Sequence, residues 1–405
     1  MEKKSNLILD VNEKPSIGKW IILAFQHVFA MFGATILVPI LVNSAAGAEV
    51  LTIPVTLVAS GIGTLIYILC TKGKSPVYLG SSFAFIAPIT AAYLKGGISG
   101  AMTGIMAVGL IYVIFAIIIK LIGKNWLDKL LPPVVIGPMI MIIGLGLAPS
   151  AISQIGLSSG AALEWQPIVV ALVAFLTTAI VAVAAKGFLK VIPFLIGIVA
   201  GYLAGVAVGI VDFTPITEAA IVGVPNFLIP FVSYTPNFSA ILTIAPIALV
   251  TIAEHIGDHT ALSAIMNRDL LKDPGLDRTL LGDGIATFVA GAIGGPANTT
   301  YGENTSVVGM TKVASVWVIG LAAIIAIILG FFTKFTALIS TIPTAVLGGV
   351  SLLLYGFISV NGLKVLIQNQ VDFNNTKNVI VASAMLVLGL GGATISIVSG
   401  DLAVT

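Results

Sequence analysis

Charged residues are scarce in this chain. Asp, Glu, Lys and Arg make up 9% of its 405 residues, and 58% of the residues are hydrophobic. A soluble globular domain carries about 25% charged residues, so water could not solvate such a surface. The composition excludes a soluble globule and predicts a chain that lies mostly in lipid.

Cysteine is rarer still, because Cys70 is the single one. One cysteine excludes a disulfide within the chain and says little about the compartment. The formal net charge of +2 does not indicate any class of partner. His, Cys, Asp and Glu show no metal-ligand spacing, and no phosphate-binding loop is present. We therefore expect no cofactor, no metal and no nucleic acid.

The sequence does contain long apolar runs. They cover residues 20–42, 49–70, 99–119, 130–149, 167–185, 191–211, 240–253, 314–332 and 345–360. Most approach or reach the ~20 residues that a helix needs to cross a bilayer. They are continuous rather than alternating in polarity, which excludes a transmembrane β-barrel. The first run lacks a small-residue cleavage site, so we expect a retained span rather than a signal peptide. The prediction is an all-α polytopic membrane protein.

The basic residues predict the orientation, because short cytoplasmic loops carry Lys and Arg in excess. If the N-terminus is inside and each hydrophobic unit crosses or turns in order, 17 of the 19 basic residues fall on the cytoplasmic face. Only Lys95 and Lys334 fall outside. We expect a multi-pass protein of the cytoplasmic (inner) membrane with a cytoplasmic N-terminus.

Two apolar segments are too short to span. Residues 82–94, SFAFIAPITAAYL, and 302–313, GENTSVVGMTKV, would each rise only ~20 Å as helices. Each follows a polar or Gly/Pro-rich stretch, GKSPVYLGS and GGPANTTY respectively. Irregular backbone at membrane depth is tolerated where it is buried in protein or lines a cavity. Paired interrupted helices of this kind indicate the substrate site of a transporter.

The two interrupted segments occupy similar places in an internal repeat. Gln26 precedes Glu254 by 228 residues in similar contexts, and Gly80 precedes Gly302 by 222. Two landmarks with nearly one spacing predict a repeat of about 220–230 residues. Seven crossings per copy would make the copies inverted. Two full copies need roughly 440 residues, so we expect the last span of the second repeat to be missing.

Six ionisable residues stand within or beside the apolar segments: His27, Glu254, His255, Asp258, His259 and Glu303. Such residues cost at least ~2.5–3.5 kcal/mol each in a bilayer, which makes them functional candidates. Glu254 and Asp258 are four residues apart and share one helical face. Glu303 opens a half-helix, where free N–H groups and the positive end of the helix dipole stabilise a carboxylate. We expect carboxylates at the mouth of a broken helix, facing a cavity.

Several motifs resemble those of a known family. They are FQH at 25–27, YLGSSFAFIAP at 78–88, AEHIGDH at 253–259, DPGL at 273–276, NTTYGEN at 298–304 and GGVSLLLYG at 348–356. The chain resembles the nucleobase/ascorbate transporter family from about residue 18 to its end, and within it the bacterial uracil permeases. NTTYGEN is far more selective than a lone glycine motif.

The resemblance implies a fold of fourteen helical segments in two inverted repeats of seven, arranged as a core and a gate domain. The implied divisions are 1–17 as a cytoplasmic tail, 18–124 and 239–334 as the core halves, and 125–238 and 335–405 as the gate halves, the last incomplete. It also implies a homodimer in the lipid bilayer and import of uracil or a related nucleobase with protons by alternating access.

Roles for individual residues follow from the same resemblance. Glu254 and Glu303 would accept hydrogen bonds from the uracil ring, and backbone groups at Phe83 and Gly302 would complete its polar edges. Ala34 and Tyr301 would line the site, Tyr355 would approach from the gate, and Gln26, His27 and His255 could support it. The chemistry fits, because a ring edge that alternates C=O and N–H needs both acceptors and donors.

One residue departs from the family pattern. Relatives carry a histidine four residues after the first glutamate, whereas this chain carries Asp258 there and His259 one step, ~100°, further round the helix. We expect Glu254 and Asp258 to share the transported proton, with Glu303 as a third proton-coupling carboxylate. In the alternative, Asp258 only hydrogen-bonds a neighbouring helix and Glu303 alone carries the proton.

Other interpretations stay open. Glu303 could be a helix-start acid, Glu254 a structural hydrogen-bonding group, and His27 and His255 core histidines. Xanthine or another nucleobase could replace uracil as the substrate. An anion exchanger of the same architecture is disfavoured because its substrate would be repelled by the two glutamates. An enzyme is not expected, because no Ser/His dyad or metal cluster is present.

Overall fold

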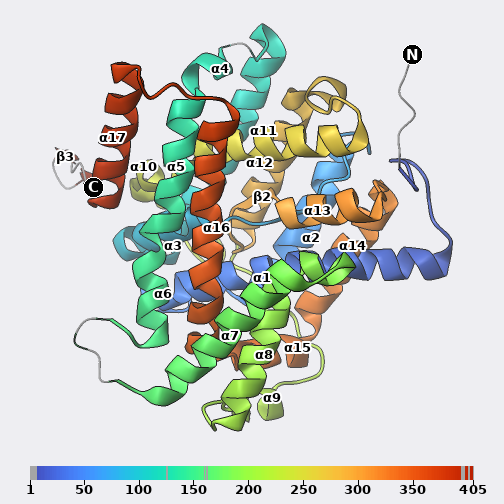
Figure 1. Ribbon diagram of the computed structural model, residues 1–405, viewed down its shortest axis with the longest axis vertical. Coiled ribbons are helices and arrows are strands. Elements are labelled where there is room, and N and C mark those ends of the chain that lie inside the picture. The colour runs from blue at the N-terminus through green and yellow to red at the C-terminus, as the bar shows by residue number, and fades with distance from the viewer. Residues whose placement is uncertain are drawn as a thin grey trace. The chain divides into compact units, whose positions relative to one another are not determined.

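The computed structural model describes residues 7–124, 126–158, 160, 163–393, 397–399 and 402–404. The described chain is predominantly helical (Figure 1). Six of its helices are long and apolar enough to cross a membrane, and up to eight are if each bent pair counts as one span. The predicted all-α polytopic architecture is confirmed at this level.

The chain divides into two compact units. Unit 1 comprises the residues up to Gly123 together with Lys186–Ile192 and Ile216–Ile339, and unit 2 comprises Lys124–Ala185, Pro193–Pro215 and the residues from Ser340 on. The longer helices of unit 1 are α1 (Ile17–Ala46), α2 (Ile53–Cys70), α3 (Ile86–Ile122), α11 (Ile247–Met266), α12 (Leu276–Ala292), α13 (Gly302–Thr311) and α14 (Val316–Phe331). Its short elements are β1 (Leu79–Ser81), η1 (Phe83–Phe85), η2 (Gly187–Val191), η3 (Phe238–Ala240), α10 (Ile241–Ile244), η4 (Leu271–Gly275) and β2 (Asn298–Thr300).

Unit 2 is built from α4 (Leu127–Leu130), α5 (Pro133–Gly146), α6 (Ala148–Ile155), α7 (Trp165–Ala184), α8 (Pro193–Ala207), α16 (Thr344–Gln368) and α17 (Thr376–Leu390). Helices α9 (Thr214–Glu218) and α15 (Thr333–Ser340) cross the boundaries between the units. Strands β3 (Ile397–Ser399) and β4 (Leu402–Val404) pair antiparallel. Helix α16 packs against α5, α6, α7 and α8.

The core of unit 1 forms where α12 packs against α2 and α3. Glycine permits the close approach of α3 and α12, because a Cβ on Gly109 would lie 2.6 Å from the backbone oxygen of Gly284. Small residues at the contact let membrane helices pack by van der Waals attraction, which replaces the hydrophobic driving force that is missing in lipid. This packing fixes the surroundings of the polar groups that α12 carries.

A two-stranded antiparallel sheet lies at the centre of unit 1. Strand β1 pairs with β2 in the register Leu79↔Thr300, Gly80↔Thr299 and Ser81↔Asn298. A helix begins directly after each strand, at Phe83 and at Gly302. The first helix breaks at Gly97, whose φ of 63° is accessible to glycine at no steric cost. The second ends at Thr311, before Lys312 in the left-handed region. Both predicted interrupted helices are confirmed.

Two of the longer described helices, α12 and α17, lie outside the predicted apolar runs. Helix α12 carries Asp277, Arg278 and Asp283, which break up its hydropathy, and α17 is only 15 residues long and starts with polar side chains. The predicted run at 240–253 continues to Met266 after a 46° bend, and the run at 314–332 bends by 79° into α15. The prediction that the second repeat lacks its last span stays a prediction, and of the residues after 393 only 397–399 and 402–404 are among those described.

Candidate functional site

Tyr301 locks together the two helix starts. Its hydroxyl donates to the backbone oxygen of Ser81 at 3.0 Å and accepts from the Thr35 hydroxyl at 3.1 Å. Its backbone N–H donates to the oxygen of Tyr78 at 3.1 Å, and the side chain is buried. Ala34 lies beside this lock, and its carbonyl oxygen is 3.5 Å from the Ser81 hydroxyl. The predicted residues Ala34 and Tyr301 therefore belong to one rigid junction of α1, β1 and β2.

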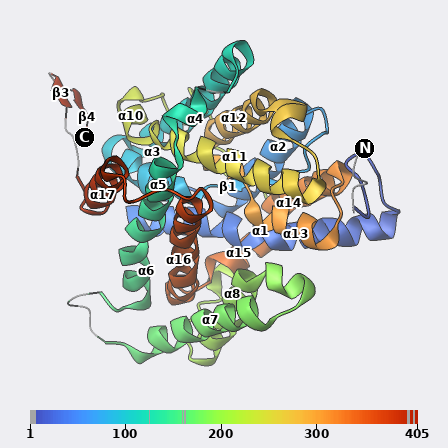
Figure 2. The same cartoon turned by 45° about the horizontal axis from the view of Figure 1, so that its top comes forward.

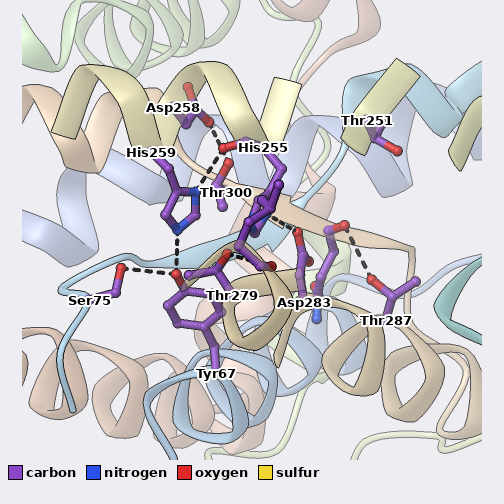
Figure 3. Close-up of polar contacts among 12 residues, drawn as sticks. Tyr67, Ser75, Thr251, His255, Asp258, His259, Thr279, Asp283, Thr287 and Thr300 are labelled. Atoms are coloured by element: carbon purple, nitrogen blue, oxygen red, sulfur yellow. Dashed lines mark hydrogen bonds and ion pairs between the residues drawn. The ribbon is translucent and has the colours of Figure 1, made fainter. Parts of the chain in front are cut away.

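Helix α11 presents two different polar faces. Glu254 is exposed and Asp258 is half-buried, whereas His255 and His259 are fully buried. The predicted shared face of Glu254 and Asp258 is confirmed, because both lie on one continuous helix one turn apart. The other face points into the core of unit 1. Figure 3 shows Asp258 on the opposite side of α11 from the ring of His259.

Asp258 lies at the start of α13. Its carboxylate accepts from the hydroxyl of Thr300 at 2.5 Å, and a Cβ on Gly302 would lie 3.8 Å from Asp258 Oδ1. Glu254 accepts no hydrogen bond from any described residue. An accessible carboxylate without an internal partner is free to bind a ligand.

Glu303 lies in the first turn of α13, where backbone N–H groups of the helix start are free of helical partners. Its side chain is half-buried, while Gly302 is exposed. Phe83 begins η1 after strand β1 and is half-buried. Helix α11, which carries Glu254 and Asp258, packs against α13, which carries Glu303. Three carboxyl groups of unit 1 therefore lie on two neighbouring helices.

A buried chain of polar groups contacts the face of α11 that carries His255 and His259, which we call the back of α11 (Figure 3). His259 Nδ1 lies 2.7 Å from the backbone oxygen of His255. A carbonyl can only accept, so Nδ1 carries a proton, and Nε2 lies 2.5 Å from the Tyr67 hydroxyl oxygen. The Tyr67 oxygen is 2.9 Å from Ser75 Oγ. The chain ties α11 to α2 and to the loop that follows α2.

His255 forms the second support. Its Nδ1 is 2.9 Å from Asp283 Oδ2 on α12, and both side chains are fully buried. The rings of His255 and His259 stack with centroids 4.1 Å apart. His255, predicted as a possible supporting residue, therefore lies behind α11 and not on the face of Glu254.

His27 supports α13 from α1. The side-chain amide of Asn304 donates to His27 Nδ1 and to the His27 backbone oxygen, at 3.1 Å each. His27 is buried, and Gln26 beside it is half-buried. Tyr355 lies in unit 2, where it is buried on α16. Among the described residues, no group of three or more His, Cys, Asp or Glu side chains could hold a metal ion.

Three partners of the predicted residues were missed in the sequence. Asp283 carries the same signal as the other acids, a charge among apolar neighbours, but its segment was not recognised as a helix. Thr300 and Asn304 are neutral and lie within the motif that contains Glu303. Only the folded backbone brings them to Asp258 and His27.

Apolar spanning helices, two helix starts that meet at a buried sheet, and carboxylates beside them define a polytopic membrane transporter. A family model described as "Permease family" matches residues 18–398. The chain belongs to this family, the nucleobase/ascorbate transporters. It is therefore an integral, multi-pass membrane transporter and not an enzyme.

Individual relatives agree with this assignment. The chain is 48% identical to the uracil permease of Bacillus caldolyticus over 96% of its own length and 89% of that protein. It is 46% identical to the uracil permease of Bacillus subtilis over 99% of its own length and 92% of that protein. Among solved structures, the transmembrane domain of a cyanobacterial bicarbonate transporter, BicA, superposes with a TM-score of 0.67 at 17% identity, covering 95% of this chain and all of that one. At such low identity the likeness concerns the fold alone.

Proposed function

We propose that this chain carries uracil, or a closely related nucleobase, across the cytoplasmic membrane together with protons. The observation that carries the proposal is the placement of Glu303 at the start of α13, a helix that packs against α11, which carries Glu254. The full-length relatives named uracil permeases support the choice of substrate.

The chemistry of a nucleobase matches these groups. A pyrimidinedione ring presents N–H donors that Glu254 and Glu303 can accept, and carbonyls that the free backbone N–H groups at Phe83 and Gly302 can satisfy. Each buried polar group left without a partner would cost about 1–3 kcal/mol. Ala34 and Tyr301 form the wall beside the ring, held in place by the bonds to Ser81 and Thr35.

Protons enter the mechanism through the same carboxylates. Negative charges at Glu254, Asp258 and Glu303 repel one another, and the repulsion is relieved when one of them binds a proton. The site should therefore bind a neutral substrate and a proton together more tightly than it binds either one alone. The Thr300 bond holds Asp258 beside the helix start, where it can share a proton with Glu254. If Asp258 is only a structural acceptor for Thr300, Glu303 carries the proton alone.

Transport by alternating access requires two parts that move relative to each other. We assign the core role to unit 1, which carries every proposed substrate contact except Tyr355, and the gate role to unit 2. Orientation with a cytoplasmic N-terminus, two inverted repeats of seven segments and a homodimer in the lipid bilayer complete the proposal.

Uptake into proteoliposomes tests this function. We expect the purified protein to accumulate labelled uracil when an inward proton gradient is imposed, and to stop when the gradient is collapsed. Excess uracil should compete best, ahead of thymine, xanthine and ascorbate. Sulfate should neither compete nor be taken up, because the carboxylates repel an anion. If uracil only equilibrates across the membrane and does not respond to the gradient, transport is not coupled to protons. If sulfate accumulates, the protein is an anion exchanger instead.

A further inference from the structure

The first described residues run along the link between α13 and α14, and both ribbon views show them beside these helices (Figures 1 and 2). We name Leu7–Lys14 the N-terminal strap. Four backbone hydrogen bonds join it to the link: Ile8 N to Lys312 O at 2.7 Å, Leu9 N to Lys312 O at 3.4 Å, Ala314 N to Leu9 O at 3.0 Å and Val316 N to Val11 O at 3.0 Å.

The link needs these partners. Val313, Ala314 and Ser315 are buried and outside any helix. Buried backbone groups must be hydrogen-bonded. The strap supplies the acceptor for the N–H of Ala314, and the Ser315 hydroxyl donates to the oxygen of Glu13 at 2.6 Å. The strap thus holds the end of α13 that lies opposite Glu303.

The same strap holds the end of α11. Asp10 Oδ2 forms an ion pair with Arg268 Nη2 at 2.5 Å, two residues after the last residue of α11. The backbone N–H of Val11 donates to Asp10 Oδ1 at 2.7 Å and so orients the carboxylate. Val11 itself is buried in one apolar cluster with Met266 of α11 and Val308 of α13. Three kinds of contact therefore converge on the ends of two helices.

The far end of the strap is anchored as well. The ammonium group of Lys14 lies 4.4 Å from the ring centroid of Trp20 and 5.4 Å from that of Trp317. Trp317 also donates through its indole N–H to the oxygen of Asn12 at 3.2 Å. Cation–π contacts of this kind fix the strap against α1 and α14. It is held along its whole length.

We propose that the N-terminal strap is a positioning element for the transport site, with Asp10 and Arg268 as its positioning residues. Helix α13 has ten residues and is about 15 Å long. Glu303 lies at the first turn of α13, and the strap contacts the other end of that helix. Helix α11 carries Glu254 and also ends beside the strap. By fastening the two ends to each other, the strap sets the spacing of the carboxylates. This inference rests on the proposed function of those carboxylates.

A charge swap tests the proposal. The variants are Asp10→Arg, Arg268→Asp and the double swap, and the matched control is Lys74→Asp. Lys74 forms an ion pair of similar length and exposure with Asp273, at 2.6 Å, but that pair does not join α11 to α13. One measurement is hydrogen exchange of the amides of residues 302–311 without substrate. The other is the uracil concentration for half-maximal uptake.

We expect each single variant to speed exchange in residues 302–311 and to raise the half-maximal uracil concentration about two- to fivefold, the range typical of an exposed ion pair. The double swap should restore both values, and Lys74→Asp should change neither. The proposed role of the strap would be overturned if hydrogen exchange is unchanged in the single variants, or if the double swap does not restore the exchange rate of the parent. If the parent protein does not transport uracil, the proposed function fails while the exchange measurement still decides the role of the strap.

Discussion

The two units bury different kinds of residue. Unit 1 buries His27, His255, His259, Asp283, Asn298 and Asn304, whereas the buried polar residues described in unit 2 are Thr178, Thr341, Ser351 and Ser359. In unit 2, contacts between small residues join the helices, as where a Cβ on Gly349 would lie 2.9 Å from Cα of Ala171. Directional hydrogen bonds hold a helix in one rotation, and unit 2 has few buried side chains that could form them. Unit 1 is therefore built to hold groups in place, and unit 2 is built with few such constraints.

The largest effect is expected at the carboxylates of unit 1. Glu254→Gln and Glu303→Gln should each weaken uracil binding about 10- to 100-fold, because Gln replaces a charged acceptor worth about 1.5–3 kcal/mol. Binding calorimetry on the purified variants measures this. Glu164→Gln, an exposed glutamate of unit 2, serves as the matched control and should bind like the parent. Near-native uracil affinity in either of the first two variants would remove that residue from the site.

The second largest effect is expected at the buried hydrogen bond between His255 and Asp283. Asp283→Asn leaves His255 facing an amide in a fully buried place, which should cost about 1–3 kcal/mol of stability. Thermal unfolding in detergent should show a lower transition temperature. In unit 2, Ser351→Ala changes a residue that is equally buried but carries no charge, and it should unfold close to the parent. Equal losses in both variants would contradict the division between the units.

Asp258→Asn tests, within unit 1, whether Asp258 takes part in proton coupling or only accepts a hydrogen bond from Thr300. The variant keeps an acceptor for Thr300 but cannot share a proton, so folding should be retained while gradient-driven accumulation of uracil falls about tenfold, the size of one charge-assisted hydrogen bond. Uracil binding measured from pH 5 to pH 9 should also depend less on pH than in the parent. Accumulation that survives with an unchanged pH profile would make Asp258 structural and leave the coupling to Glu303.

The smallest effect is expected at the back of α11. Tyr67→Phe removes one hydroxyl from the chain between His259 and Ser75, and a hydrogen bond of this type contributes about 0.5–1.5 kcal/mol. We expect a slightly lower unfolding temperature and uracil affinity reduced less than in the glutamate variants. Ser359→Ala, which removes a hydroxyl bonded 2.9 Å from Tyr355 O in unit 2, should affect stability alone. Equal affinity losses in both variants would show that the back of α11 does not position the site.

The fold was predictable where the signal is local. Long apolar runs predict spanning helices, and the Gly/Pro-rich stretches before residues 82 and 302 predict that two helices start late. The spacing of Glu254 and Asp258 predicts their common face for the same reason, since one turn of helix relates them.

The partners of these residues were not predictable, because they depend on packing between distant segments. Asp258 meets Thr300 across 42 residues, and His27 meets Asn304 across 277. His255 and Glu254 are neighbours in sequence, yet one lies in the core and the other is exposed. A hydropathy pattern that hardly distinguishes the faces of α11 cannot say which way each side chain points. Helix α12 was missed because its own polar residues, which the core needs, interrupt the apolar signal.

The small sheet also constrains how the protein is made. Strand β1 ends at Ser81 and its partner β2 begins at Asn298, so about half of the chain is synthesised between them. Until β2 emerges, the peptide groups of β1 lack the ladder that satisfies them, and lipid offers no substitute. The first half-helix must therefore wait in the translocon or among other helices while unit 2 begins to form. Closure of the sheet that joins the two helix starts is therefore a late event in biogenesis, because β2 begins only at Asn298.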